Sequence, residues 1–293
     1  MKKLLLVLGV IALASCEKSN DEIITPPDSQ SPRLLTVEVS ENPMHDENAS
    51  AREMTRTAAA TTTESLSGFT MHYTDAWSNP FTKTGSTWST ATWPSSDDIQ
   101  NTTPLDFYAH DGGTFVWNNG NPYVSFTMEE DASSQKDFLV ATHKQISYSQ
   151  SGGGVVSLAF AHACAAVQFY VFQEESASYM VNSIILRNVC KQGDYYYNNT
   201  GATPKWQNVR TKTHYTLTTN VPENPFAVTT PVRLPCGWLY LIPQTKDGTQ
   251  EENGIQIEIN YNSGKQKILN LSGSWDAGKQ YTVNIRIGKA KTS

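Results

Sequence analysis

The side chains that most often carry catalysis are present, but their spacing matches no catalytic motif. The histidines of the chain are His45, His72, His110, His143, His162 and His214. None lies in the HExxH pattern of a zinc protease, and no GxSxG accompanies the His110-Asp111 pair, as a hydrolase nucleophile would require. His162 lies among apolar residues, which favours a hydrogen-bonded core histidine over a ligand. The sequence therefore predicts no enzyme and no cofactor.

Runs of acidic residues and glycines are equally poor candidates for a site. The side chains of Glu129-Glu130-Asp131, being adjacent, would point to opposite faces of a strand. Ser151-Gly152-Gly153-Gly154 lacks the lysine and the following helix of a phosphate-binding loop. The remaining candidate ligands for calcium are Asp97-Asp98 and Asp194, and they lack EF-hand spacing. The sequence therefore predicts no catalytic carboxylate pair and no bound metal.

Cys16 is the residue with the clearest chemistry. Two lysines and about 12 apolar residues precede it, a stretch that would span roughly 18 Å as a helix and is too short to cross a bilayer of about 30 Å. Leu13-Ala14-Ser15-Cys16 resembles a bacterial lipobox, which implies that Cys16 receives diacylglycerol and, after cleavage, a further acyl chain. Two or more chains give stable anchoring. The alternative is an ordinary signal peptide that ends near a cysteine.

Three thiols remain after Cys16, namely Cys164, Cys190 and Cys236. An odd number of cysteines in an exported protein cannot pair fully within one chain. Their spacing contains no CxxC or Cys/His pattern of a zinc site. Buried, inert thiols are the expected outcome. One disulfide among the three is the alternative, and its pairing does not follow from the sequence.

Composition narrows the class of protein that must position these residues. The chain has 293 residues, enough for one large or two medium domains. Charged residues make up only 17%, and the 10 Phe, 7 Trp and 13 Tyr favour extended structure over helical bundles. The net charge of −6 argues against a nucleic-acid partner. The N-terminal apolar run is the only long one, which excludes a polytopic membrane protein.

Short extended segments alternate with turn residues from about Leu66 onward. Strands separated by about 8–12 residues with turn signals between them are typical of β-sandwiches. Asn262-Ser263-Gly264 is a good hairpin turn, and Gln192-Gly193-Asp194 is expected to end a strand over 181–189. The other expected strands are 69–73, 105–110, 123–128, 215–219, 238–242, 255–261, 267–271 and 281–287, with a longer apolar stretch over 155–172.

The segment between Cys16 and this strand-rich region has an unusual layout. Residues 17–33 form a polar tether. A short strand over 34–39 follows, with Leu35, Val37 and Val39 on one face. A second polar stretch then runs to Arg56 and contains Arg52. An isolated strand between two flexible segments costs closure entropy twice, so its role needs a specific explanation.

Five phrases in order resemble the fimbrillin family, the lipoprotein-derived subunits of type V pili. They are Trp93-Pro94 with Leu105-Asp106-Phe107-Tyr108-Ala109, then Gln135 to Ala141, Val156 to Val167, Leu239 to Gln244, and Trp275 to Ile285. The resemblance covers roughly two-thirds of the chain and follows a lipobox. It implies an all-β fold of two tandem transthyretin-like β-sandwich domains. With the signal peptide at 1–16 and the tether and first strand at 17–56, the expected domains are 57–150 and 151–293.

The resemblance also implies how such a protein functions. A lipidated precursor reaches the outer membrane, an arginine-specific protease removes the N-terminal segment, and a strand from a neighbouring pilus subunit fills the groove that is left. Leu35, Val37 and Val39 would then be the strand-exchange plug, and Arg56-Thr57 the preferred cleavage bond. The alternative is a permanent edge strand followed by a solvated loop.

The C-terminus departs from the pattern of a polymerising subunit. Only six residues follow Ile287, and a donor strand needs about 6 or more residues of its own. This favours an accessory or tip adhesin of the fimbrium, unless the last strand itself swings out as donor. A second hypothesis is a glycan-binding surface lipoprotein that does not polymerise. Its candidate stacking aromatics, all in expected loops, are Trp77, Trp88, Trp117 and Trp206. The expected external partner is a host glycan or protein receptor.

Overall fold

The computed structural model describes residues 33–46, 66–173, 181–198, 205–219, 231–246 and 254–287. Within these ranges the regular structure consists of strands and one short 3-10 helix, η1 (Ala132–Ser134). This confirms the all-β prediction. None of the described residues belongs to a helix with the length and apolarity needed to cross a membrane. The predicted sites at Cys16, Arg56 and Thr57 lie outside the described residues. All the described residues belong to one compact unit, Arg33–Ser293.

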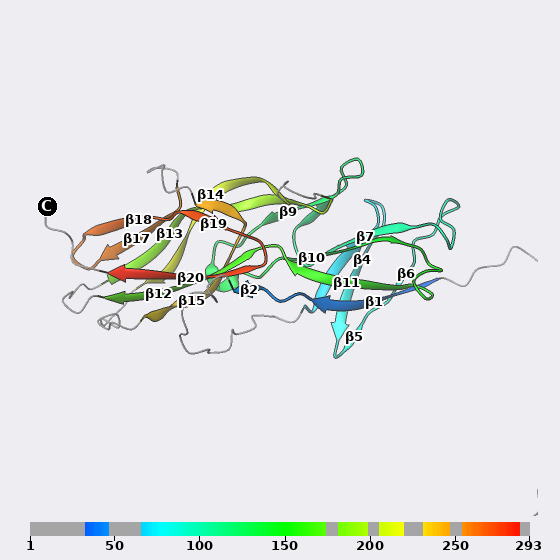
Figure 1. Cartoon of the computed structure of the whole chain (residues 1–293), viewed down its shortest axis with the longest axis horizontal. Helices are drawn as coiled ribbons and strands as arrows, with labels where there is room; N and C mark the ends of the chain where they lie inside the picture. The colour runs from blue at the N-terminus through cyan, green and yellow to red at the C-terminus, as the bar shows by residue number, and fades with distance from the viewer. Residues whose placement is uncertain are drawn as a thin grey trace, which may run out of the picture. The chain divides into compact units, whose positions relative to one another are not determined.

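The first sheet has eight strands in the order β5-β4-β3-β7-β10-β11-β1-β6 (Figure 1). These strands are β1 (Leu34–Glu41), β3 (Gly68–His72), β4 (Ser78–Thr84), β5 (Thr87–Trp88), β6 (Ala91–Thr92), β7 (Leu105–His110), β10 (Leu139–Ile146) and β11 (Val155–His162). The bounds of β7 are those predicted from the sequence. β10 and β11 are antiparallel neighbours.

This sheet curls around its own hydrophobic core. β3 and β11 are three places apart in the strand order, which in a flat sheet would separate them by about 14 Å. Yet the rings of Phe69 on β3 and Phe160 on β11 lie 5.0 Å apart between centroids. Buried side chains from β1, β3, β4, β7, β10 and β11 therefore share one cluster, which we call the first core.

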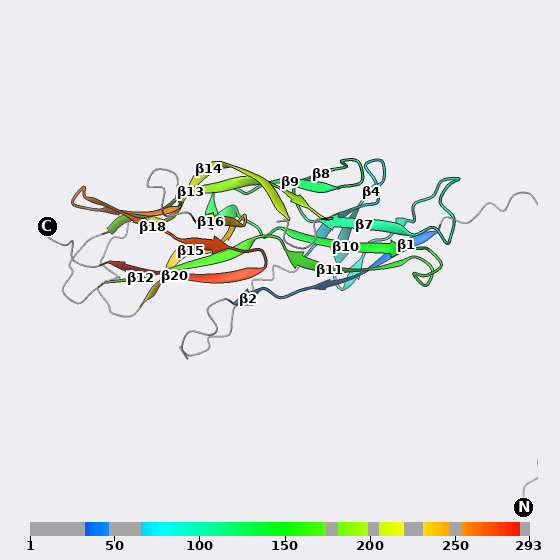
Figure 2. The same ribbon diagram turned by 45° about the horizontal axis from the view of Figure 1, so that its top comes forward.

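The second half of the fold is a sandwich of two sheets (Figures 1 and 2). One has the order β15-β12-β20-β2, from β2 (His45–Asp46), β12 (Ala165–Gln173), β15 (Val232–Leu241) and β20 (Lys279–Ile287). The other has the order β18-β17-β13-β9-β8, with β14 also paired to β13. Its strands are β8 (Thr114–Val116), β9 (Tyr123–Thr127), β13 (Val181–Tyr196), β14 (Trp206–Thr219), β17 (Gln256–Tyr261) and β18 (Gln266–Asn270). A small pair, β16 (Gln244–Lys246) and β19 (Gly273–Trp275), completes the set.

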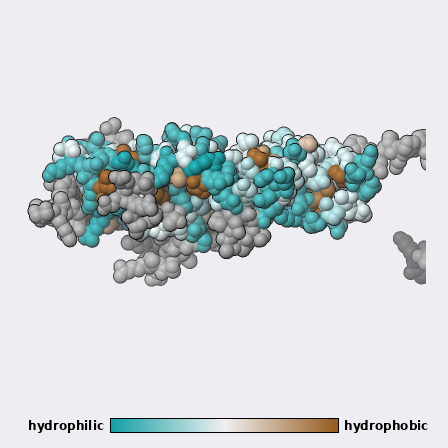
Figure 3. All heavy atoms as spheres, turned by 90° about the horizontal axis from the view of Figure 1, so that it is seen from above, coloured by the Kyte–Doolittle hydropathy of each residue, from teal (hydrophilic) through white to brown (hydrophobic). Residues whose placement is uncertain are grey.

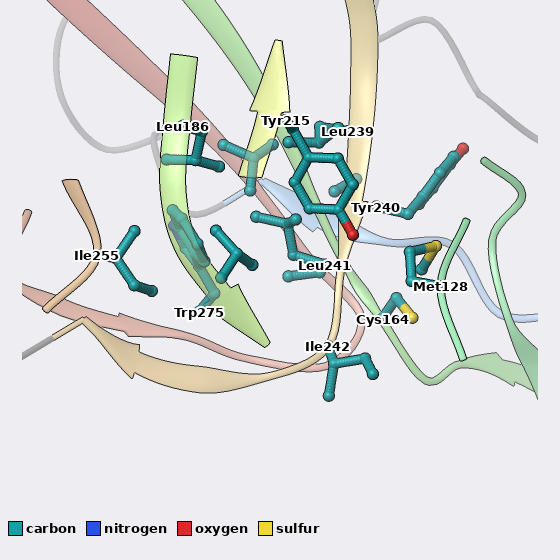
Figure 4. Close-up of a cluster of buried hydrophobic side chains, with 14 of the residues drawn as sticks. Met128, Cys164, Leu186, Tyr215, Leu239, Tyr240, Leu241, Ile242, Ile255 and Trp275 are labelled. Carbon is teal, nitrogen blue, oxygen red and sulfur yellow. The ribbon is translucent and has the colours of Figure 1, made fainter. Parts of the chain in front are cut away.

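Large apolar side chains from both sheets meet between them and form the second core. Figure 4 shows Leu239 and Leu241 of β15 facing Leu186 of β13 and Tyr215 of β14. Trp275 is 1% exposed in the same cluster. The described residues thus form β-sandwich structure around two separate cores, as expected from the spacing of the strands.

The two cores do not divide the chain at residue 150. β8 and β9 precede that position but pair with the sheet of β13, and β11 follows it but pairs with β10. The loop over 148–154 therefore joins two neighbours of one sheet. The change from one core to the other comes at Phe160 and Ala163, which belong to the first and second cores respectively. The domain bounds 57–150 and 151–293 stay predictions.

The expected turn at Gln192-Gly193-Asp194 is wrong, because β13 continues through it to Tyr196. Here β13 pairs with β9 on one side and β14 on the other. A Cβ on Gly193 would lie 2.8 Å from the ring of Trp206, so the glycine leaves room for that ring rather than making a turn. The Asn262-Ser263-Gly264 turn is confirmed, with Gly264 at φ 78° between β17 and β18.

Candidate functional site

The strand predicted over 34–39 is β1, which we call the leader strand. It runs parallel to β11, in register from Thr36 beside Val155 to Glu41 beside Phe160. At its start it also pairs with the short β6, antiparallel, through Leu34 and Leu35. Its other edge beyond Leu35 has no strand among the described residues. The leader strand is therefore an integral member of the first sheet.

The side chains of the leader strand alternate as predicted. Leu35 is fully buried in the first core, and Val37 and Val39 pack against that core. On the opposite face Glu38 is exposed, and its Oε2 accepts a hydrogen bond from the hydroxyl of Ser157 at 3.0 Å. Full burial of one leucine stabilises the docked strand by about 2 kcal/mol. The plug role assigned to Leu35, Val37 and Val39 stays a prediction.

Gly154 allows the leader strand to approach. The amide of Thr36 donates to the carbonyl of Gly154 at 2.9 Å. A Cβ on Gly154 would lie 1.9 Å from the carbonyl oxygen of Leu34, and its φ of +103° also excludes most side chains. Only glycine fits between β11 and the leader strand at this point.

Arg33 holds the upstream end of the leader strand. Its Nη1 donates to Oδ1 of Asn101 at 2.7 Å, and its Nη2 donates to the carbonyls of Pro94 at 3.4 Å and Ile99 at 3.5 Å. The guanidinium carbon lies 5.6 Å from the centroid of the Tyr148 ring. The Arg33 side chain thus contacts two separate loops of the first sheet, the segment 94–101 and the segment that contains Tyr148.

A group of buried titratable side chains lies at the downstream end. His162 Nδ1 pairs with Oδ2 of Asp137, which confirms a hydrogen-bonded histidine. Burial raises the pKa of Asp137 although His162 opposes the shift. Burial lowers and Asp137 raises the pKa of His162, with a net increase. Burial also raises the pKa of Asp111 to about 7. Glu41 of the leader strand accepts from the amide of Leu66 at 3.0 Å through Oε1.

The candidate stacking aromatics are divided between the two cores. Trp206 is 6% exposed, and its Nε1 donates to the carbonyl of Ala163 at 2.6 Å, so its ring packs in the second core. It lies in β14, not in the expected loop. Trp77 and Trp88 pack against the first core, and Trp117 against the second. Each of these three stays partly exposed. Their ligand role stays a prediction.

The thiols carry no pairing or reactive arrangement. Cys164, Cys190 and Cys236 are all free, so none of them forms the alternative disulfide. Cys164 is fully buried, and burial raises the pKa of its thiol well above the ordinary value. Over the ranges that the structure describes, no three His, Cys, Asp or Glu side chains gather to hold a metal ion.

Sequence reasoning missed the two residues that position the start of the leader strand, Arg33 and Gly154. By sequence, Arg33 belongs to the polar tether over 17–33, and Gly154 to a glycine run that lacks the features of a phosphate-binding loop. A signal for Gly154 existed, since it is the last glycine before the long apolar stretch. No local signal identifies Arg33, because its acceptors lie more than 60 residues away in the chain.

Comparison with known proteins bears on the family to which most of the chain belongs. The fimbrillin-like family matches this chain over residues 40–293. A search of curated proteins found no match. Among solved structures, a candidate cell adhesion protein from Bacteroides ovatus is similar at 13% identity and a TM-score of 0.50, covering 87% of this chain and 92% of that one. A fimbrial protein from Bacteroides vulgatus has 13% identity and a TM-score of 0.46, with 87% and 96% covered.

At these identities, the likeness to the Bacteroides ovatus structure bears on the fold alone. The family match is independent of it and spans most of the sequence, including every described strand after β1. The chain belongs to the fimbrillin-like family.

Proposed function

We propose that this protein is a surface-anchored pilus subunit, an accessory or tip adhesin that acts in cell adhesion and assembles by strand exchange. The observation that carries the proposal is the docking of the leader strand. The leader strand buries Leu35 fully and pairs in parallel with β11 from Thr36 to Glu41. Between β2 and Leu66 lie 19 residues that the structure does not describe, and the proposed cleavage bond is among them.

The physical basis of exchange is the edge of β11. If the leader strand departs, the backbone groups of β11 from Val155 to Phe160 lose their partners, and the site of Leu35 opens to water. An exposed edge beside an apolar groove is a template for another strand. A strand from a second subunit restores both the hydrogen bonds and the buried side chain.

Processing and anchoring complete the proposal. We place the cleavage at Arg56-Thr57, since it lies between the leader strand and β3, the next strand of the same sheet. Cys16 carries the lipid that holds the precursor in the outer membrane, and the matured subunit joins the fimbrium. Neither site lies in the described residues.

The test is conversion of purified precursor by a trypsin-like, arginine-specific protease. We expect a new N-terminus at Thr57 and ladders of multimers that survive mild detergent. Arg56→Gln should block both, whereas Arg52→Gln should leave both unchanged. N-terminal sequencing of the surface form is the companion measurement. If intact protein beginning at lipidated Cys16 is the only surface form, the processing step is wrong.

A further inference from the structure

The loops around Arg33 form a binding site for a cation at the mouth of the leader groove, the surface of β11 and β6 that the leader strand covers. We infer that this site selects the occupant of the groove: a strand with a basic residue two positions before its buried aliphatic residue. If the strand in the groove comes from a second subunit, the inference depends on the proposed strand exchange. Where the occupant is the protein's own leader strand, it stands independently.

The chemistry of the site matches a guanidinium group. Its three polar contacts are all oxygen acceptors: Oδ1 of Asn101 and the carbonyls of Pro94 and Ile99. Arginine offers five donors and no acceptor. The ring of Tyr148, 5.6 Å from the guanidinium carbon, adds a cation–π contact. An ionised acidic side chain has no donor for these three oxygens, and glutamine offers two donors against the five of arginine.

The site is built by residues that do not belong to the leader strand. The Tyr148 ring packs edge-on against Trp93 at 5.4 Å, and Trp93 is 1% exposed. The amide of Ser149 donates to the carbonyl of Asn101 at 2.9 Å, which ties the two loops together. The amide of Ile99 donates within its own turn, to Ser96 at 3.0 Å. The contacts of Asn101, Ile99 and Tyr148 do not involve the leader strand, so they remain when it leaves, whereas Pro94 follows β6, which pairs with the leader strand.

Two backbone contacts fix the position along the groove at which the strand docks. The amide of Trp93 donates to the carbonyl of Arg33 at 2.8 Å, and the carbonyl of Leu34 lies over Gly154. With those two positions set, Leu35 must enter the first core. An incoming strand would therefore need the order basic residue, any residue, large aliphatic residue, then smaller apolar residues at alternate positions.

The first test uses the full chain and measures amide hydrogen exchange in the leader strand, from Thr36 to Glu41. With Arg33→Gln we expect exchange about tenfold faster there and unchanged in β12. Arg33→Lys should fall between, because lysine keeps the charge but lacks the planar fork. Lys83→Gln is the matched control, since Lys83 lies 5.6 Å over the Trp88 ring on the same sheet. If Arg33→Gln leaves leader-strand exchange unchanged, the cation site is wrong.

The second test asks about the partner. The protein is cut between β2 and β3, and labelled peptides RLLTVEVSE and QLLTVEVSE compete for the groove. We expect the arginine peptide to be retained at least about fivefold better. Equal retention overturns the selection. If neither peptide enters while Arg33→Gln still accelerates exchange, strand exchange itself fails, and the site stands only as the anchor of the protein's own leader strand.

Discussion

Two glutamines, Gln135 buried and Gln244 partly buried, supply hydrogen bonds to backbone groups that no neighbouring strand pairs. The amide of Tyr240 donates to Oε1 of Gln135 at 2.9 Å, and Gln135 donates on to the carbonyl of Glu129 at 3.1 Å. Gln244 does the same beside β13: the Cys190 amide donates to its Oε1 at 2.9 Å, and its Nε2 donates to the Ile242 carbonyl at 2.9 Å. Both lie in phrases that carried the family resemblance, and in both the amide completes hydrogen bonding where no strand is adjacent.

Replacing Gln244 with leucine should therefore be costly. The partly buried Cys190 amide would lose its acceptor, and the loss of one hydrogen bond costs about 0.5–1.5 kcal/mol. Urea unfolding should show a lower midpoint for Gln244→Leu than for Gln266→Leu, a control at an exposed position. Equal midpoints would show that water replaces the glutamine.

Gly154 offers a sharper comparison. Gly154→Ala places a methyl group 1.9 Å from the Leu34 carbonyl, so the leader strand has to move. Gly153→Ala has a similar φ of +93° but no atom within 4 Å of the new Cβ. Backbone strain of about 1–3 kcal/mol is common to both variants. We expect lost protection of leader-strand amides in Gly154→Ala alone; the same loss in Gly153→Ala would refute the steric argument.

His72 and His110 form a neutral pair that is sensitive to acid. Nδ1 of His110 donates to the Gly112 carbonyl at 2.7 Å, so its Nε2 accepts from Nε2 of His72 at 3.0 Å. Nδ1 of His72 is then a buried lone pair without a hydrogen-bond partner, and the ring stacks on Phe115 at 4.0 Å. Burial, with His110 nearby, lowers the pKa of His72 to about 4, and burial lowers the pKa of His110.

The sign of the pH effect follows from the lowered pKa. An unfolded histidine binds its proton at about pH 6.5, whereas folded His72 does not until about pH 4, so stability is lost as pH falls through that window. Asp111 acts oppositely, because its raised pKa favours folding as pH falls from about 7. We expect His72→Phe to lose less stability than the native chain between pH 7 and 5. The exposed His214→Phe should behave like the native chain; the same slope for all three would exclude the pair.

At the scale of elements, the docking of the leader strand can be tested by substituting two neighbouring leucines. Leu35 is fully buried and Leu34 is 52% exposed, so the two positions differ in burial but not in residue type. Leu35→Ala should lower the free energy of unfolding by about 2–5 kcal/mol, the usual cost of a core leucine. Leu34→Ala should stay within about 0.5 kcal/mol. Denaturant midpoints decide, and equal effects would mean that the strand is not docked in solution.

Strands were predictable from the sequence where apolar and β-forming residues continue from one turn signal to the next. β7 has its predicted bounds, and β9 lies within the strand predicted over 123–128. The predicted strand over 181–189 stopped short, since only the ring of Trp206 explains a glycine inside β13. The stretch over 155–172 is two strands in different sheets, because the break at Ala163 is stabilised by a distant indole. Tertiary contacts of this kind, like the parallel pairing of β1 with β11, leave no local signal.

At the scale of the whole molecule, a few specific contacts connect the two cores. The hydroxyl of Tyr197 on the segment after β13 donates to the carbonyl of Ala109 on β7 at 2.9 Å. Phe115 of β8 stacks on His72 of β3. Because β8 and β9 belong to the sheet of the second core, residues before position 150 are needed to complete that sheet. We therefore expect a fragment of residues 151–293 to be far less stable than the native chain, by circular dichroism on heating; native-like melting would show that β8 and β9 are dispensable.

Over the part of the chain that the structure describes, the surface offers little to attract another copy. The face in Figure 3 is mostly hydrophilic, with hydrophobic residues scattered over it. Among the described residues, the large hydrophobic side chains that are exposed are Leu34 and Ile268. Single exposed residues of this kind are normal for a monomer. The uncut protein should elute as a monomer in size-exclusion chromatography at micromolar concentration; ladders without protease would contradict the proposed trigger.

The parallel pairing of β1 with β11 has a consequence for any filament built through this groove. If every incoming strand keeps the direction of β1, each junction repeats the same head-to-tail sense. Such a filament would have two chemically different ends, one with a vacant groove and one without. Growth would then proceed from a single end, and the order of arrival would decide which molecule occupies the terminus.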